Sequence, residues 1–126
     1  MPAFILGLCG LTFLAFGLGF MVAPERLLGT LGPLTATPDL LTDLRAIYGG
    51  LNLGLGIGLL AALGRPALHR PALALTACTL GAVAVGRMIG VATTGFERDL
   101  TAIFLALESV GAAAAAVAWN RTKATT

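Results

Sequence analysis

The sequence predicts an all-α integral membrane protein: an antiparallel four-helix bundle that forms one domain over residues 1–126. Of the 126 residues, 57% are hydrophobic and 11% are charged, whereas about a quarter of residues are charged in an average soluble domain. The apolar residues gather into four runs, each long enough to cross a hydrocarbon core of about 30 Å as a helix. Short connections between the runs predict that consecutive helices lie antiparallel and side by side. Soluble fold classes are thereby excluded.

The bounds of the four spans follow from the apolar runs and from the residues that separate them. The first span is predicted over about residues 3–23, and Pro24 follows it. This run lacks a basic leading segment and a small-residue cleavage site, so it is interpreted as a membrane span and not as a signal peptide. The other spans are predicted over about residues 40–63, 71–92 and 99–119. Since a span must satisfy its own backbone hydrogen bonds in lipid, all four are expected to be helices.

The first connection, "PERLLGTLGPLTATPD", is long enough for structure of its own. Residues 25–31 are predicted to form an interfacial helical turn. The side chains expected to enter the lipid boundary are Leu27, Leu28 and Leu31. The next helix is predicted to begin with Thr37 as N-cap and Pro38 in the first helical position.

Positive charge is distributed unevenly over the connections. The second connection and the tail carry four basic residues beside His69, namely Arg65, Arg70, Arg121 and Lys123. The first and third connections carry two, Arg26 and Arg98, diluted by Glu25, Asp39, Glu97 and Asp99. Because Lys and Arg are retained on the cytoplasmic side, both termini are predicted to be cytoplasmic. The expected location is the bacterial cytoplasmic membrane, with several spans.

Three ionisable residues lie inside predicted spans: Arg45, Arg87 and Glu108. A central arginine costs about 2.5–3.5 kcal/mol on insertion scales, so these residues require a common explanation. Tyr48 and Asn52 follow Arg45 at helical steps of three and four, which predicts one polar stripe. If the stripes turn inward, all five residues converge on a polar pocket in the outer half of the membrane.

Two arginines and one glutamate leave one positive charge over. We expect Arg87 to pair with Glu108, because helices joined by a short loop are neighbours. The charge on Arg45 could be met by a lipid phosphate, a quinone-like amphiphile or an acidic side chain of a partner. Alternatively, one arginine extends to the outer headgroups while the other locks the bundle with Glu108. An arginine neighbour would keep Glu108 ionised, which weakens a proton-carrier role.

Glycines recur every fourth residue in two spans. Gly50, Gly54 and Gly58 line one stripe of the second span, and Gly86 and Gly90 repeat the spacing in the third. Small residues at this spacing let another helix approach closely in lipid. The stripes predict either a face for a partner or second copy, or packing within the chain.

Catalysis, metal binding and nucleic-acid binding find no support in the sequence. His69 is the only histidine, and no His, Cys or carboxylate cluster has the spacing of a metal or nucleophile site. Cys9 and Cys78 lie within apolar runs and are interpreted as small buried hydrophobes. The net charge of +2 is too small and too scattered for a nucleic-acid surface. We therefore expect no enzymatic activity, no metal and no cofactor.

The segments "LRAIYGGLNLGLGIG", "GRMIG", "TTGF" and "LES" begin at residues 44, 86, 93 and 107. With them, the chain resembles a small bacterial membrane family called domain of unknown function 4345, itself reminiscent of DoxX-like four-helix proteins. The resemblance implies a four-helix membrane protein with Arg45, Arg87 and Glu108 in characteristic positions, and it supplies no activity. By analogy, the association of DoxX-like proteins with membrane redox complexes favours an accessory or quinone-linked role.

Three functions remain open from the sequence. The first is a non-enzymatic accessory or scaffold subunit of a larger membrane complex. The second is a stand-alone binder or carrier of a lipid-like or quinone-like amphiphile, and the third is a small proton-coupled transporter. The expected partners are membrane lipid and either a larger membrane complex or further copies of the chain.

Overall fold

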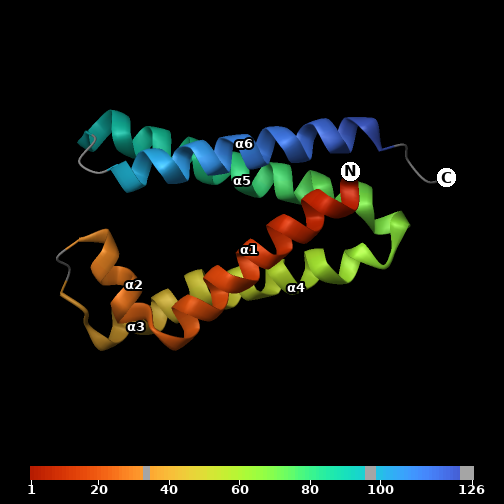
Figure 1. Ribbon diagram of the computed structural model, residues 1–126. Helices are drawn as coiled ribbons and strands as arrows, with labels where there is room; N and C mark the ends of the chain where they lie inside the picture. The colour runs from red at the N-terminus through yellow and green to blue at the C-terminus, as the bar shows by residue number, and fades with distance from the viewer. Residues whose placement is uncertain (33–34, 96–98, 123–126) are drawn as a thin grey trace. The chain divides into compact units, whose positions relative to one another are not determined.

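The computed structural model describes residues 1–32, 35–95 and 99–122, and within them every regular element is helical (Figure 1). The elements are α1 (Pro2–Val22), α2 (Pro24–Leu31), α3 (Pro38–Asp43), η1 (Leu44–Leu51), α4 (Asn52–Leu63), α5 (Pro66–Thr94) and α6 (Asp99–Arg121). Elements α3, η1 and α4 are continuous. In the described part of the chain, four helices are long and apolar enough to cross a membrane: Pro2–Val22, Pro38–Leu63, Pro66–Thr94 and Asp99–Arg121. The predicted all-α membrane architecture is confirmed.

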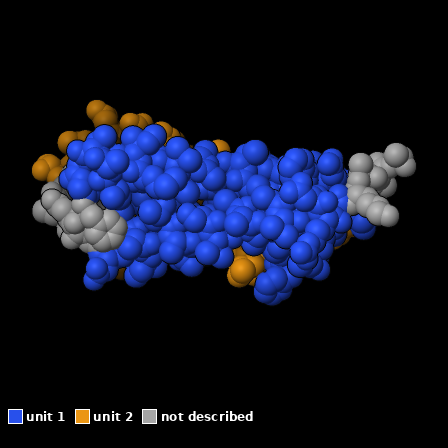
Figure 2. Space-filling model, turned by 90° about the horizontal axis from the view of Figure 1, so that it is seen from above, with its two compact units in different colours: residues 1–6, 65–126 blue, residues 7–64 orange. Residues whose placement is uncertain are grey.

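The chain forms two compact units, shown in different colours in Figure 2. One unit comprises residues 1–6 and 65–126, and it contains α5 and α6. The other comprises residues 7–64, and it contains most of α1 together with α2, α3, η1 and α4. Each unit is built around one antiparallel pair of long helices.

Prolines and one threonine define where the helices begin. Helices α1, α2, α3 and α5 each start at a proline, whose missing N–H would have had no partner in the first turn. At α3 the Thr37 hydroxyl accepts a hydrogen bond from the Leu40 N–H at 3.2 Å, which confirms the predicted N-cap. Helix α5 ends at Thr94 and is followed by Gly95, whose φ of 85° favours glycine.

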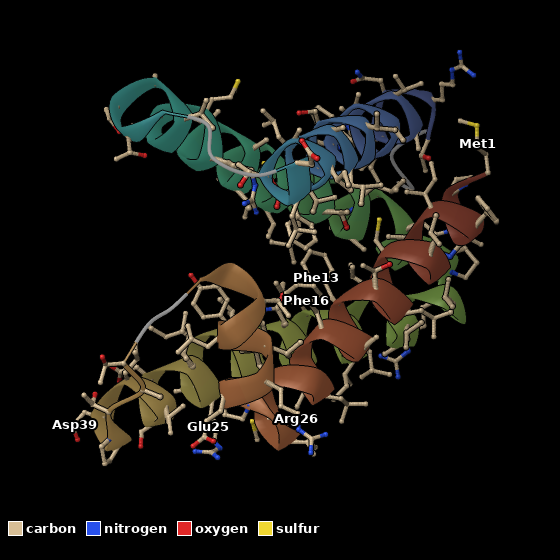
Figure 3. All side chains as sticks on the ribbon, turned by 60° about the vertical axis from the view of Figure 1, so that its left-hand side comes forward. Met1, Phe13, Phe16, Glu25, Arg26 and Asp39 are labelled. Carbon is tan, nitrogen blue, oxygen red and sulfur yellow. The ribbon has the colours of Figure 1, made fainter. Side chains whose placement is uncertain are left out.

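Helix α2 packs onto the end of its own unit. Leu28 is buried in a cluster with Phe20 and Leu44, and Leu27 is packed against this cluster. The helix itself was predicted, but the placement of Leu28 in lipid is wrong, because Phe20 and Leu44 offer it a protein surface. Glu25 and Arg26 project from the beginning of α2 and are exposed (Figure 3). The side chain of Leu31 lies outside the described residues.

The backbones of α1 and of the η1–α4 helix touch at glycines. A Cβ added at Gly17 would lie 2.6 Å from the Leu53 nitrogen and 2.9 Å from the Gly49 oxygen. A Cβ added at Gly56 would lie 2.6 Å from the Leu14 nitrogen and 2.9 Å from the Gly10 oxygen. Gly10 thus meets Gly56 and Gly17 meets Gly49, in the reversed order of an antiparallel pair. Each helix presents two glycines seven residues apart, so the contact extends over two turns.

The π-helical winding of η1 places its two buried residues on one side of the helix. Leu44 and Gly49 are the buried residues of η1. Residues five apart point about 140° from each other in an α-helix of 3.6 residues per turn, but the i→i+5 bonding of a π-helix stacks them one turn above the other. The same winding leaves Arg45 and Gly50, also five apart, on the exposed side. The polar stripe predicted from α-helical spacing therefore has a different geometry in the structure.

Helices α5 and α6 lie side by side along their length (Figure 1). Helix α5 begins at Pro66, before the predicted start at residue 71, and Pro71 lies inside it. A proline this close to the N-terminus removes only one backbone hydrogen bond, so the helix continues through it. Three charged residues of the loops and tail, Glu97, Arg98 and Lys123, lie outside the described residues.

Candidate functional site

Arg87 of α5 and Glu108 of α6 form the ion pair that the adjacency of these helices predicts. The Arg87 Nε donates a hydrogen bond to the Glu108 Oε2 at 2.8 Å, and the Arg87 Nη2 donates one to the Glu108 Oε1 at 2.6 Å. Two parallel bonds of this kind are the strong, bidentate form of the arginine–carboxylate interaction. The pair therefore joins the two helices and neutralises both charges inside the spans.

Burial of this pair is partial. The side chains of Arg87 and Glu108 are 28% and 14% exposed. The predicted buried Arg/Glu cluster is corrected accordingly, because two helices cover a side chain between them from two sides only. Phe104 supplies part of the cover, since its ring centre lies 5.3 Å from the Arg87 guanidinium carbon. A guanidinium over an aromatic face is further stabilised by the electrons of the ring.

Arg45 differs from Arg87 in having no ionic partner among the described residues. It lies on η1, it is exposed, and it forms no ion pair with the residues that the structure describes. Asp43 lies close in sequence, but no salt bridge joins the two residues. The excess positive charge expected from the sequence is thus located on Arg45.

Tyr48 and Asn52 lie at the end of η1, where it continues into α4. The Asn52 amide donates a hydrogen bond to the Tyr48 carbonyl oxygen at 2.7 Å. The Tyr48 ring lies 5.2 Å from the ring of Phe20, and this residue is 49% exposed. Tyr48 thus has one side against α1 and the other open.

The five predicted site residues divide into two groups. Arg45, Tyr48 and Asn52 belong to the unit of residues 7–64, and Arg87 and Glu108 belong to the other unit. Each group is joined internally, by the amide hydrogen bond in the first and by the ion pair in the second. Convergence of both groups on one pocket stays a prediction.

The glycines of the predicted stripes have open space around them. No atom lies within 4 Å of a Cβ added at Gly54, Gly58, Gly86 or Gly90, and at Gly50 the nearest is the Arg45 oxygen at 3.8 Å. The closest contacts of the first helix pair fall instead on Gly10, Gly17, Gly49 and Gly56. The packing role of the predicted stripes stays a prediction. The spacing of seven in two successive spans is the signal that identifies the contacting glycines.

Sequence reasoning missed a second polar contact between α5 and α6. The Arg70 guanidinium carbon lies 5.3 Å from the centre of the Trp119 ring. The signal was present, because an arginine at the beginning of one span and a tryptophan at the end of the next meet when the helices are antiparallel. Tryptophan is also common at the membrane interface.

The described residues contain no group of three His, Cys, Asp or Glu side chains that could hold a metal ion. The arrangement offers a neutralised ion pair between two helices, an exposed guanidinium beside a tyrosine, and open glycine surfaces.

Comparison with known protein families identifies one match. The family described as "Domain of unknown function (DUF4345)" matches residues 2–119, nearly the whole chain. No curated protein and no solved structure is significantly similar to the chain.

Proposed function

The chain belongs to the DUF4345 family, and from that premise we propose that it is a non-enzymatic accessory or scaffold subunit of a larger membrane complex. We place it in the bacterial cytoplasmic membrane with both termini on the cytoplasmic side, because basic residues concentrate at the α4–α5 connection and in the tail. A reporter enzyme that works only outside the cytoplasm, fused after residue 126, should be inactive; an active fusion would reverse the orientation.

The open glycine surfaces carry this proposal. Gly54 and Gly58 of α4, and Gly86 and Gly90 of α5, leave flat surfaces on helices that are long enough to span a membrane. Helices associate in lipid through close packing of small residues, because lipid supplies no hydrophobic drive for association. We therefore propose that a transmembrane helix of a partner subunit packs there.

The short connections support the same function. Two residues, Gly64 and Arg65, separate α4 from α5, and residues 95–98 separate α5 from α6, whereas residues 23–37, which include α2, separate the first two spans. The two shorter connections leave little surface outside the membrane for recognition of a soluble partner. We therefore propose that the chain recognises its partner within the membrane.

Native mass spectrometry of the protein extracted from its own membrane in mild detergent tests the proposal. Gly58→Leu and Gly90→Leu fill the open surfaces, and Ala102→Leu adds comparable bulk to an exposed position of α6 as the matched control. We expect larger subunits in fixed stoichiometry, lost in both glycine variants and kept in the control. A lone chain, or copies of this chain only, would refute the accessory role.

A second candidate function is the binding of an anionic or quinone-like amphiphile at Arg45. Arg45 is exposed without an ionic partner among the described residues, and Tyr48 on the same π-helix is half exposed. Segments of π-helix are frequent at functional sites. One retained amphiphile per chain, lost in Arg45→Leu and kept in Arg26→Leu, would support this function.

The Glu108 geometry is less suited to a proton-coupled transporter. Both carboxylate oxygens accept hydrogen bonds from Arg87, which holds the carboxylate in place. A proton carrier must release its partner during each cycle. The geometry supports a structural role for Glu108.

A further inference from the structure

The end of the α5–α6 pair that holds Arg70 and Trp119 is strongly basic. Arg65 precedes α5, Arg70 lies near its beginning, and Arg121 lies in the last turn of α6. The described acidic residues of this unit lie elsewhere: Asp99 begins α6 at the opposite end, and Glu108 is paired with Arg87. This end therefore carries positive charge that the described chain does not neutralise.

Arg70 has hydrogen-bonding capacity that the described chain leaves unused. Its Nε atom is buried and has no hydrogen-bond partner, and its contact with another described side chain is the stacking on Trp119. A guanidinium has five N–H donors, of which one lies on Nε and four lie on the two Nη atoms. The Nε atom is covered by the protein, so an acceptor from outside the described chain would bind the two Nη atoms, which are not among the buried atoms of this partly exposed residue.

The neighbouring backbone also favours an anion. Helix α5 has no acidic residue in its first turn and no side chain that caps its N-terminus. The partial positive charge of that helix end consequently adds to the charges of Arg65 and Arg70. Trp119, with an apolar ring and a polar N–H, fits the boundary between acyl chains and headgroups.

We propose that Arg70 and Trp119 form a binding site for a phosphate anion, supplied by the headgroup of an acidic phospholipid. The phosphate oxygens accept hydrogen bonds from Arg70, and Arg65 adds charge beside them. The acyl chains lie along α5 and α6. The residues of this site are other than the glycines of the open surfaces and Arg45.

The fluorescence of Trp119 tests the site directly, because it is the only tryptophan of the chain. The purified full-length protein, freed of lipid in nonionic detergent, is titrated with dihexanoyl phosphatidylglycerol, dihexanoyl phosphatidylcholine or inorganic phosphate. We expect a saturable change with phosphatidylglycerol. A response to inorganic phosphate as well would identify the free anion as a sufficient ligand, whereas a response to phosphatidylglycerol alone would identify the lipid. An equal response to phosphatidylcholine, or no response, would overturn the proposal.

Two variants distinguish specific binding at Arg70 from a general attraction to the positive charge at this end of the helices. Arg70→Gln should weaken phosphatidylglycerol binding by more than about tenfold, because a charge and charge-assisted hydrogen bonds are lost together. Arg121→Gln removes one charge at the same end and should weaken binding by no more than about fivefold. Equal losses in the two variants would overturn the proposal.

A further variant covers the case in which Arg70→Gln does not fold. Arg70→Lys keeps the charge but lacks the planar set of donors. This variant should bind phosphatidylglycerol more weakly than the unaltered protein does, and it should still bind phosphatidylglycerol more tightly than it binds phosphatidylcholine. Circular dichroism checks that helicity is kept. A co-purified protein that is lost in Arg70→Gln, without any lipid response, would assign the arginine to a protein partner and refute the lipid site.

Discussion

The pair formed by α1 with η1 and α4 is joined through backbone, whereas α5 and α6 are joined through side chains. In the first pair, Gly17 and Gly56 bring their helices so close that an added Cβ would lie 2.6 Å from a backbone nitrogen of the other helix. In the second pair, the guanidinium of Arg87 reaches the carboxylate of Glu108. Lipid supplies no hydrophobic drive for either association, so each pair depends on close packing or on polar contacts.

The difference determines which substitutions each helix pair tolerates. Backbone atoms cannot move aside without shifting a whole helix, so the first pair should respond sharply to added volume. Side chains can rotate, so the second pair should tolerate added volume and respond to lost charge.

The largest effect is expected for Gly17→Ala. The new methyl group would meet the Leu53 nitrogen and the Gly49 oxygen, and we expect a loss of about 3 kcal/mol, the upper part of the range for overpacking. Gly58→Ala is the matched control, since no atom lies within 4 Å of its added Cβ. Unfolding in increasing sodium dodecyl sulfate, followed by circular dichroism, measures both. Similar stabilities of the two variants would contradict the backbone contact.

A smaller effect is expected for Arg87→Leu, about 2 kcal/mol, since Glu108 loses two charge-assisted hydrogen bonds. Glu108→Gln in the same chain should restore part of the loss, because the unpaired carboxylate is removed. The two single variants and the double variant form a cycle, and we expect a coupling of about 1 kcal/mol. Strictly additive losses would show that the pair contributes nothing as a pair.

The contrast also explains what could be predicted from the sequence. Four long apolar runs predict four spans, because the length of a span is fixed by the thickness of the bilayer. The Arg87–Glu108 pair was predictable because charges inside spans are rare and few combinations exist. The glycines that form helix contacts could not be identified in the same way, since the chain has 17 glycines. A spacing of four residues favoured Gly54 and Gly58 as contact residues, whereas the glycines in close contact are seven residues apart.

The π-helix could not be predicted for a related reason. Propensity and periodicity distinguish helix from strand, but the choice between α and π winding of residues 44–51 depends on tertiary packing. Leu44 must reach Phe20 and Leu28 while Gly49 faces Met21. Both requirements are met when residues five apart share a face. The sequence could place Arg45 in this helix but not describe its surroundings.

The smallest effect is expected for Gly111→Ala. A Cβ added there would lie 2.8 Å from the Leu80 Cδ1 atom, the end of a flexible side chain. This distance resembles that at Gly17, yet Leu80 can adopt another rotamer, so we expect a change in stability below about 1 kcal/mol in either direction. Alanine also favours the helix over glycine by about 0.5–1 kcal/mol, which offsets part of the repacking. The same detergent titration as for Gly17→Ala allows a direct comparison. A loss at Gly111 as large as that at Gly17 would mean that α5 and α6 are as rigidly packed as the first pair, and that the ion pair is not what chiefly joins them.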